Sequence, residues 1–173
     1  MSTFAKTQEA LNKFAKYVIQ QSRTNLTKQK RNASGKLYES LGYDLNVSPN
    51  SFSLEFFMED YGAYIDEGVH GSKSSYIESR NSRFEFSGRF KTIPTKALDN
   101  WVVRKGIAPR DAKGRFIDRQ SLKYVIAKSI YEKGIKASLF FTKPFERAFD
   151  NLPPEVVEAF ALDIDDLLEF TIR

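Results

Sequence analysis

The stretch Tyr61–Gly71 constrains the fold of this chain more than any other part of its sequence. It reads Tyr-Gly-Ala-Tyr-Ile-Asp-Glu-Gly-Val-His-Gly and lies between an alternating apolar run and a long basic segment. Aromatic and β-branched residues favour strands, and glycine is the usual residue where the backbone must turn sharply. We therefore expect a strand through Tyr64 and Ile65 that ends abruptly in a loop. A distant stretch, Gly134–Phe149, is its expected partner.

Residues 3–31 carry a helical pattern. Apolar residues such as Phe14 and Val18 recur at spacings of three, four and seven, whereas lysines lie outside that stripe. Ser2 or Thr3 is the expected N-cap, because a side-chain oxygen there accepts hydrogen bonds from the first turn of a helix. We expect a long amphipathic helix that buries one face.

Further helices are expected along the rest of the chain. A short one follows Ser34, and another runs from Pro94 to about Gly106. Residues 119–133 form a third, with Val125 on its apolar side and Gly134 as its C-cap. The last one opens at Pro153 and runs to about Glu169.

Alternating apolar residues predict strands between the first two helices and the Tyr61–Gly71 stretch. Leu45 and Val47 alternate with polar neighbours, as do Phe52, Leu54 and Phe56. These two runs are separated by Ser-Pro-Asn-Ser, which favours a turn, so we expect a hairpin with one buried face. A further strand is expected over residues 137–141.

Together these elements predict an α+β fold in a single domain over residues 1–173. An antiparallel sheet of about four strands packs against the long N-terminal helix and the additional helices. Residues 72–120 form a long basic loop insertion, and residues 153–173 form an acidic helical extension at the C-terminus. A loop as long as this insertion is usually functional or mobile.

The charges are distributed unevenly along the chain. The net charge is +5 overall, but it is +5 over residues 1–50, −5 over 51–70, +11 over 71–147 and −6 over 148–173. Ordinary solvated faces are one explanation of this alternation. The other is that subunits meet head to tail, with an acidic face of one subunit on a basic face of the next.

The composition argues against several classes of protein. There is no cysteine, so we expect no disulfide, no thiolate zinc site and no thiol nucleophile. No apolar run approaches the roughly 20 residues that span a membrane, and the first residues lack the apolar core of a signal peptide. We therefore expect a soluble protein that is made in the cytoplasm.

No group of residues indicates an enzyme. His70 is the only histidine, and nothing marks a serine or an aspartate as its partner. Glu59, Asp60, Asp66 and Glu67 could hold Mg²⁺ only if they converged, but neighbours on a strand point to opposite faces. No glycine-rich phosphate loop occurs. We expect no catalytic residue, no metal, no cofactor and no small-molecule substrate.

The insertion carries a basic patch interleaved with phenylalanines. Its candidate contact residues are Arg80, Arg83, Arg89, Lys91, Arg110, Lys113, Arg115 and Arg119, with Phe84, Phe86, Phe90 and Phe116 among them. Such a patch can contact phosphates without reading sequence, and aromatic rings can stack on bases. It can equally meet an acidic protein partner. Both alternatives stay open.

Three segments, in order, resemble those of a known family. Ser34-Gly-Lys-Leu-Tyr-Glu-Ser-Leu, the Tyr61–Gly71 stretch and Gly134–Phe149 are similar to motifs of the tail-completion and head–tail connector (neck) proteins of long-tailed bacteriophages. Together they span roughly residues 32–149. The matching residues form a structural signature: Ser34, Gly35, Leu37, Tyr61, Tyr64, Glu67, Gly68, Phe141, Pro144 and Phe145.

The resemblance implies a structural virion protein rather than an enzyme. Such a protein forms a homo-oligomeric ring between the head connector and the tail, through which genomic DNA passes. Its implied partners are other virion proteins: the portal-side connector and the tail tube or tail terminator. It would be assembled in the host cytoplasm into the neck of the particle. The alternative is a nucleic-acid-binding or processing protein that uses residues 72–119 without sequence specificity.

Overall fold

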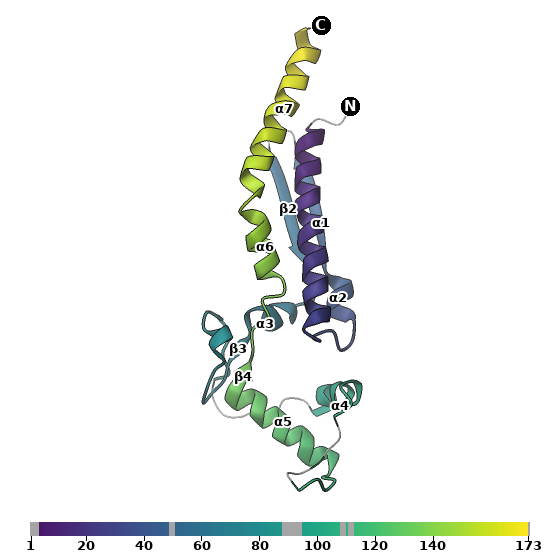
Figure 1. Cartoon of the computed structure of the whole chain (residues 1–173), viewed down its shortest axis with the longest axis vertical. Coiled ribbons are helices and arrows are strands. Elements are labelled where there is room, and N and C mark those ends of the chain that lie inside the picture. The colour runs from purple at the N-terminus through teal and green to yellow at the C-terminus, as the bar shows by residue number, and fades with distance from the viewer. Residues whose placement is uncertain (1–3, 49–50, 88–94, 108–109, 111–112, 173) are drawn as a thin grey trace. The chain divides into compact units, whose positions relative to one another are not determined.

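The computed structural model describes residues 4–48, 51–87, 95–107, 110 and 113–172, without the side chains of residues 48, 95–97 and 167–172. The predicted α+β class is confirmed: a long N-terminal helix, further helices and four short strands occur in this part of the chain (Figure 1). The four strands divide into two antiparallel sheets of two strands each, β1–β2 and β3–β4. One four-stranded sheet is therefore not what the described residues form.

The elements have the following bounds. The helices are α1 Ala5–Lys28, α2 Lys36–Ser40, α3 Gly62–Glu67, α4 Thr95–Arg104, α5 Arg119–Lys133, α6 Thr142–Phe149 and α7 Leu152–Ile172, with a 3-10 turn η1 at Ile77–Ser79. The strands are β1 Gly42–Ser48, β2 Ser51–Phe57, β3 Val69–His70 and β4 Gly134–Ile135. The predicted helices of residues 3–31, 119–133 and 153–169 correspond to α1, α5 and α7.

The chain groups into two compact units, each built from separate stretches of sequence. The first unit comprises Met1–Gln29, Lys36–Glu59 and Phe140–Arg173, and the second comprises Lys30–Gly35 and Asp60–Leu139. The expectation that residues 1–173 fold as one domain stays a prediction.

In the first unit, α1 is the central element. Its apolar stripe is buried as the periodicity predicts, with Leu11, Phe14, Val18 and Leu26 all less than a tenth exposed. The hairpin β1–β2 lies along α1, and α6 and α7 pack against it from residues more than a hundred positions later (Figure 1). This arrangement removes one face of a 24-residue helix from water, which is the main source of stability for such a helix.

The start of α1 is capped by a carboxylate that lies beside it in space but comes from the last helix of the first unit. The Asp163 side chain on α7 accepts hydrogen bonds from the backbone N–H groups of Lys6 and Thr7, at 3.1 and 2.8 Å, and from the Thr7 hydroxyl at 2.7 Å. A negative charge at a helix N-terminus also complements the helix dipole. The N-caps expected from the sequence, Ser2 and Thr3, lie outside the described residues.

The hairpin is attached to the helices by an aromatic cluster around Phe56. Its ring packs edge-to-face against Phe14 of α1 and against Phe141 and Phe145, with centroids 5.4–6.1 Å apart. The pairing of β1 with β2, from Gly42 opposite Phe57 to Ser48 opposite Ser51, confirms the predicted hairpin. A two-stranded sheet is marginally stable by itself, so this cluster is what holds it on the unit.

In the second unit, the predicted strand through Tyr64 and Ile65 is wrong. These residues belong to the short helix α3, which ends at Glu67 and is followed by Gly68, and only Val69–His70 form a strand. The physical reason is a distant partner. The N–H of Ser138 donates to the carbonyl oxygens of Ile65 and Asp66, both at 3.1 Å, and so satisfies acceptors that the last turn of a helix leaves unpaired.

The predicted partnership between Tyr61–Gly71 and Gly134–Phe149 is confirmed. Val69 pairs with Ile135 and His70 with Gly134 in an antiparallel ladder. The strand predicted over residues 137–141 is wrong, however, because β4 is confined to Gly134–Ile135. The N–H groups that follow bond to α3 and to a serine side chain instead of continuing the ladder.

Helices α4 and α5 pack together in the second unit, and one position of the predicted apolar side of α5 is misplaced. Val125, predicted to be on the apolar side of α5, is 58% exposed, whereas Lys123 is buried. The Lys123 ammonium reaches Asp99 of α4 at 3.0 Å, which pairs the buried charge. Gly134 follows the last residue of α5, as predicted, with φ at 82°.

Replacing Asp163 by alanine is expected to destabilise the first unit by about 2–3 kcal/mol, because three hydrogen bonds to a helix N-terminus are lost. Urea unfolding followed by circular dichroism measures this. The matched control is Asp166→Ala, which removes only an exposed ion pair with Lys6 and should change stability little. Equal effects of the two substitutions would contradict the capping role.

The same carboxylate makes a pH dependence expected. Burial by itself raises the pKa of Asp163, but the hydrogen bonds from Thr7 and Lys6 together outweigh it and hold the pKa below the ordinary 3.8. A lowered pKa in the folded state stabilises the fold above the unfolded pKa, and this contribution disappears as the pH falls through the folded value. The stability difference between the wild type and Asp163→Ala should therefore be full above about pH 4 and shrink in stronger acid.

Candidate functional site

The signature stretch Tyr61–Gly71 forms a tightly packed junction in the second unit, centred on Gly68. The backbone there has φ at 77°, a conformation that residues with a side chain rarely adopt. A Cβ atom at Gly68 would lie 2.5 Å from the carbonyl oxygen of Ile135 and 2.6 Å from the nitrogen of Ala137. Only glycine lets the end of α3 approach the β4 segment this closely.

Two serines complete the Gly68 junction from the beginning of the basic insertion. The fully buried Ser79 hydroxyl donates to the Ile135 carbonyl at 2.8 Å and accepts from the Ala137 N–H at 3.0 Å. The Ser82 hydroxyl donates to the Gly68 carbonyl at 2.7 Å. The start of the insertion is therefore fixed by hydrogen bonds to both signature segments.

His70 has a structural environment in this junction. Its backbone N–H donates to the Phe84 carbonyl at 2.8 Å, and its carbonyl accepts from the Phe86 N–H at 2.9 Å. A ring nitrogen, Nε2, lies 3.1 Å from the Ser82 carbonyl oxygen. These contacts extend the β3 backbone pairing to Glu85, so they place His70 in the packing of the insertion.

The other signature residues have distinct places. Tyr64 is 44% exposed and its ring lies 4.3 Å from that of Phe84, while Glu67 pairs with Arg83 at 3.3 Å. Tyr61 is exposed, Leu37 and Pro144 are buried, and Gly35 has φ at 80°. Phe141 and Phe145 belong to the Phe56 cluster. Ser34, at the surface, precedes Gly35.

The described members of the predicted basic patch are all at the surface. Those residues are Arg80, Arg83, Arg110, Lys113, Arg115 and Arg119. Arg89 and Lys91 lie outside the described residues. Because none of these six cations is buried, a phosphate or a carboxylate of a partner can approach them without a large desolvation cost.

The phenylalanines of the patch divide into packed and exposed rings. Phe84 packs on Tyr64, and Phe86 lies 5.8 Å from Tyr131 of α5, so both are partly used within the second unit. Phe116, in contrast, is 73% exposed and lies under the guanidinium of Arg110 at 4.2 Å. Phe90 lies outside the described residues. Among the described aromatic residues of this segment, Phe116 with Arg110 is thus the most accessible stacking surface.

The acidic residues before and within α3 do not gather. Asp66 is buried at 5% exposure, and Glu67 is engaged by Arg83. Among the described residues, no group of three or more histidine, cysteine, aspartate or glutamate side chains lies close enough to hold a metal ion. No helix in that part of the chain is long and apolar enough to cross a membrane.

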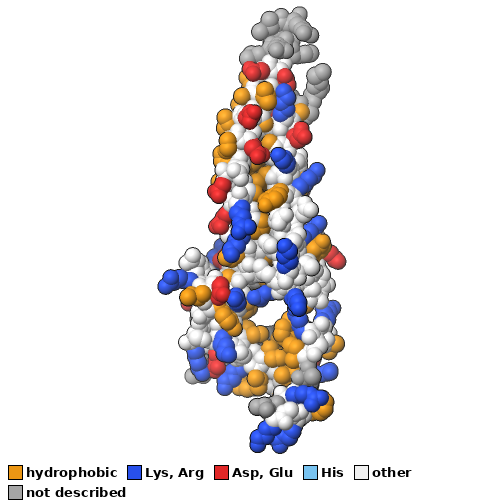
Figure 2. Space-filling view, viewed as in Figure 1, with side chains coloured by type: hydrophobic (Ala, Val, Ile, Leu, Met, Phe, Trp, Pro, Cys, Tyr) orange, Lys and Arg blue, Asp and Glu red, His pale blue; other side chains and the backbone are white. Residues whose placement is uncertain are grey.

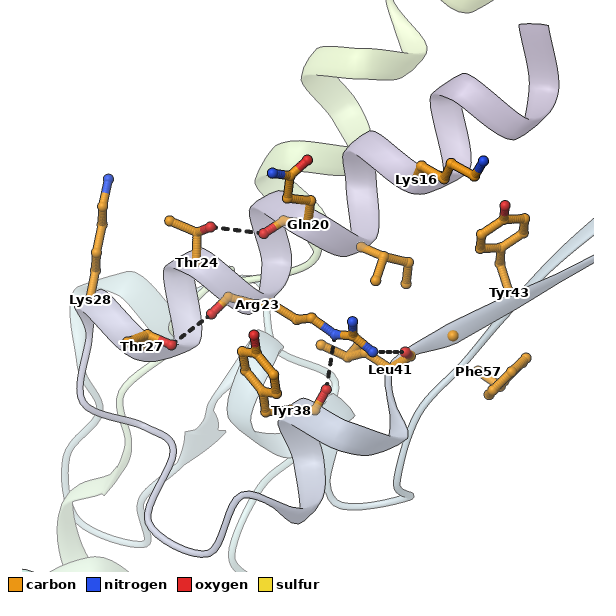
Figure 3. Close-up of a pocket in the computed structure, with 12 residues that line it drawn as sticks. Lys16, Gln20, Arg23, Thr24, Thr27, Lys28, Tyr38, Leu41, Tyr43 and Phe57 are labelled. Atoms are coloured by element: carbon orange, nitrogen blue, oxygen red, sulfur yellow. Dashed lines mark hydrogen bonds between the residues drawn. The ribbon is translucent and has the colours of Figure 1, made fainter. Parts of the chain in front are cut away.

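The first unit carries an open groove of about 900 Å³ that the sequence analysis did not predict (Figure 3). It lies between the second half of α1, helix α2 and the base of the hairpin. Lys16, Arg23 and Lys28 supply its positive charge, and no acidic side chain is among the residues that line it. Tyr38 and the half-exposed Phe57 add aromatic surface. We call this feature the α1 groove.

Arg23 is fixed in place at the α1 groove. Its side chain donates to the carbonyl oxygens of Tyr38 at 3.1 Å and Leu41 at 2.9 Å, and the guanidinium lies 5.2 Å from the centroid of the Tyr38 ring. These acceptors belong to the Ser34–Leu41 signature segment. In the sequence, the only sign of this surface was that Lys16 lies outside the apolar stripe. The contact between α2 and α1 is a tertiary feature that the sequence pattern does not reveal.

Comparisons with family models, with curated proteins and with solved structures found no match for this chain. The functional argument therefore depends on the chain's own residues. Three features carry it: the Gly68 junction, the exposed basic patch and the α1 groove. None of them contains a nucleophile paired with a base among the described residues. The two that lie at the surface, the basic patch and the α1 groove, are suited to contacts with large partners.

Gly68→Ala is expected to cost about 3 kcal/mol, because it combines an unfavourable positive φ with overlap against two backbone atoms. Hydrogen exchange at the Ala137 and Leu139 amides measures the loss locally, as faster exchange. The control is Gly106→Ala, where φ is 63° but nothing lies within 4 Å of the added Cβ atom. That control should cost about 1 kcal/mol and leave both amides protected. Similar exchange in the two variants would refute the steric role of Gly68.

Proposed function

We propose that this chain is a structural subunit of the neck of a long-tailed bacteriophage particle. It would form a ring that joins the head connector to the tail and surrounds the channel for DNA. The supporting observation is the direct pairing of two of the three segments that resemble the neck family. Val69 and His70 pair with Ile135 and Gly134 although some 65 residues separate the two segments.

This pairing supports the proposal because signature residues in both segments have identifiable roles in the packing of the chain. Gly68 is required where α3 approaches β4, and the aromatic residues after β4 join the cluster that holds the hairpin. Sequence similarity that coincides with steric necessity is more informative than similarity at unconstrained surface positions.

The basic patch is proposed to contact either the passing DNA or an acidic partner protein in the neck. Arg80 and Arg83 follow a turn that is fixed by Ser79, so the patch begins from a rigid base. Beyond it, the described cations lie at the surface, where phosphates or carboxylates of a partner can approach them. Contacts of this kind do not depend on the nucleotide sequence, as transit of a whole genome requires, and they weaken as the salt concentration rises.

The second candidate function is a nucleic-acid-binding protein that acts on its own. The observation in its favour is the exposed Phe116 ring under Arg110, since a base can stack on such a ring while phosphates contact nearby cations. Under this alternative the purified chain binds single-stranded DNA, and the logarithm of its affinity falls linearly with the logarithm of salt concentration.

Quantitative mass spectrometry of purified particles tests the proposed function. The chain should be present in intact particles at a copy number far below that of capsid and tube subunits. The soluble fraction of the same cells serves as the comparison. If the chain occurs only in that fraction, the neck proposal fails and the second candidate takes its place.

Replacing Arg80, Arg110 and Arg115 by glutamine should reduce the yield of DNA-filled particles at least tenfold, because three contacts to phosphate or carboxylate are lost. Plaque counts and packaged-DNA measurements give the readout. A matched control replaces Lys128, Lys133 and Lys143, three exposed lysines outside the patch, by glutamine. Unchanged particle yield in the arginine variant, with its far-ultraviolet circular dichroism intact, would remove the patch from the proposal.

A further inference from the structure

We infer that the α1 groove binds helix α7 of a second copy of this chain. The two surfaces are on opposite ends of the first unit, so the contact joins subunits head to tail. This inference deepens the proposed function, on which it rests for the ring, by naming the surfaces through which ring subunits meet. It follows from the charge, exposure and geometry of the two surfaces.

The α1 groove offers an apolar floor with a positive edge. Ile19 and Leu41 are buried beneath it, and Phe57 is 50% exposed at its end. Lys16 and Lys28 lie at the surface of α1 (Figure 3). Twelve residues separate these lysines, so the edge extends about 18 Å along the helix. A partner with apolar residues in the middle and carboxylates beside them matches this pattern.

Helix α7 has such a face, mostly on the side opposite α1, with Glu158 at the edge that borders α1. Its inner side is marked by the buried Asp163, which caps α1. Val157, Glu158, Ala161 and Asp165 lie on the outer side, and all four are exposed, Val157 by 69%. Figure 2 shows hydrophobic and acidic side chains gathered along the upper part of the molecule, where α7 lies. We call these four residues the outer face of α7.

The lengths of the two surfaces agree. From Val157 to Asp165 the outer face extends over about 12 Å, which fits within the 18 Å edge of the groove. Val157 and Ala161 are one turn apart and can cover the floor, while Glu158 and Asp165 lie beside them toward the lysines. Burying an exposed valine and an exposed phenylalanine together supplies the apolar component of such a contact.

A chain cannot make this contact with itself. Asp163 is bonded to Lys6 and Thr7 at the start of α1, whereas Lys16 and Lys28 are about 14 and 32 Å further along that helix. Most of the outer face of α7 also lies opposite α1, and its edge at Glu158 borders only the first half of that helix. The groove of one copy therefore takes the helix of another, and a head-to-tail contact of this kind closes into a ring or continues as a chain.

Two reciprocal variants of the full chain test the inference. One carries Lys16→Glu and Lys28→Glu, and the other carries Glu158→Lys and Asp165→Lys. Sedimentation velocity at a series of protein and salt concentrations should show that the wild type associates and that salt weakens the association. Each variant alone should associate at least about tenfold more weakly, because like charges then meet.

An equimolar mixture of the two variants should restore association to near the wild-type level. In the mixture, acidic helices face basic grooves and basic helices face acidic grooves, so every contact between unlike copies is complementary. A control with Lys128→Glu and Lys143→Glu, two exposed lysines that belong to neither surface, should behave as the wild type. Circular dichroism verifies that all variants are folded.

Several results would overturn the inference. They are a wild type that stays monomeric at every concentration, variants that associate normally, and a mixture that stays monomeric. If the Lys16/Lys28 variant associates normally but no longer binds a single-stranded oligonucleotide, the groove is a nucleic-acid site instead. A chain present in particles but monomeric in solution refutes only this contact; one that self-associates through it but is absent from particles refutes only the proposed function.

Discussion

The aromatic cluster around Phe56 is the interaction on which the first unit depends. A two-stranded hairpin has too few backbone hydrogen bonds and too little buried surface to persist alone, so its position is set by the rings of Phe14, Phe141 and Phe145. The base of the hairpin forms one wall of the α1 groove. The shape of that groove therefore depends on the aromatic packing that holds the hairpin on α1.

The parts of the fold that could be predicted from sequence are those that show a regular apolar pattern or depend only on residues close by in the sequence. The apolar stripe of α1, the alternation in β2 and the glycine after α5 each depend on neighbours within a few positions. The stretch at Tyr64 and Ile65 could not be assigned this way, since short apolar runs suit a helix or a strand equally. Its outcome depends on the Ser138 N–H group, which lies more than seventy residues away.

The candidate sites show the same division. The pairing of Tyr61–Gly71 with Gly134–Phe149 could be predicted because glycine and aromatic residues are concentrated in both segments. The exposure of the patch arginines could be predicted because charged side chains are seldom buried. The α1 groove was not, because Lys16, Tyr38 and Phe57 come from three elements whose sequences give no sign of one another. Surfaces assembled by tertiary contacts leave no pattern in any single window of sequence.

The Asp163 cap also determines when the first unit can form during synthesis. The backbone N–H groups of Lys6 and Thr7 are made early, but the carboxylate that satisfies them is translated 156 residues later than Thr7. The whole of the second unit lies between them in sequence and includes no residue beyond Leu139. On the ribosome, contacts within that middle segment can therefore form before α7, with Asp163, is available to cap α1. Nascent chains that stop short of α7 would expose the part of α1 that α7 covers, which makes them natural clients for chaperones.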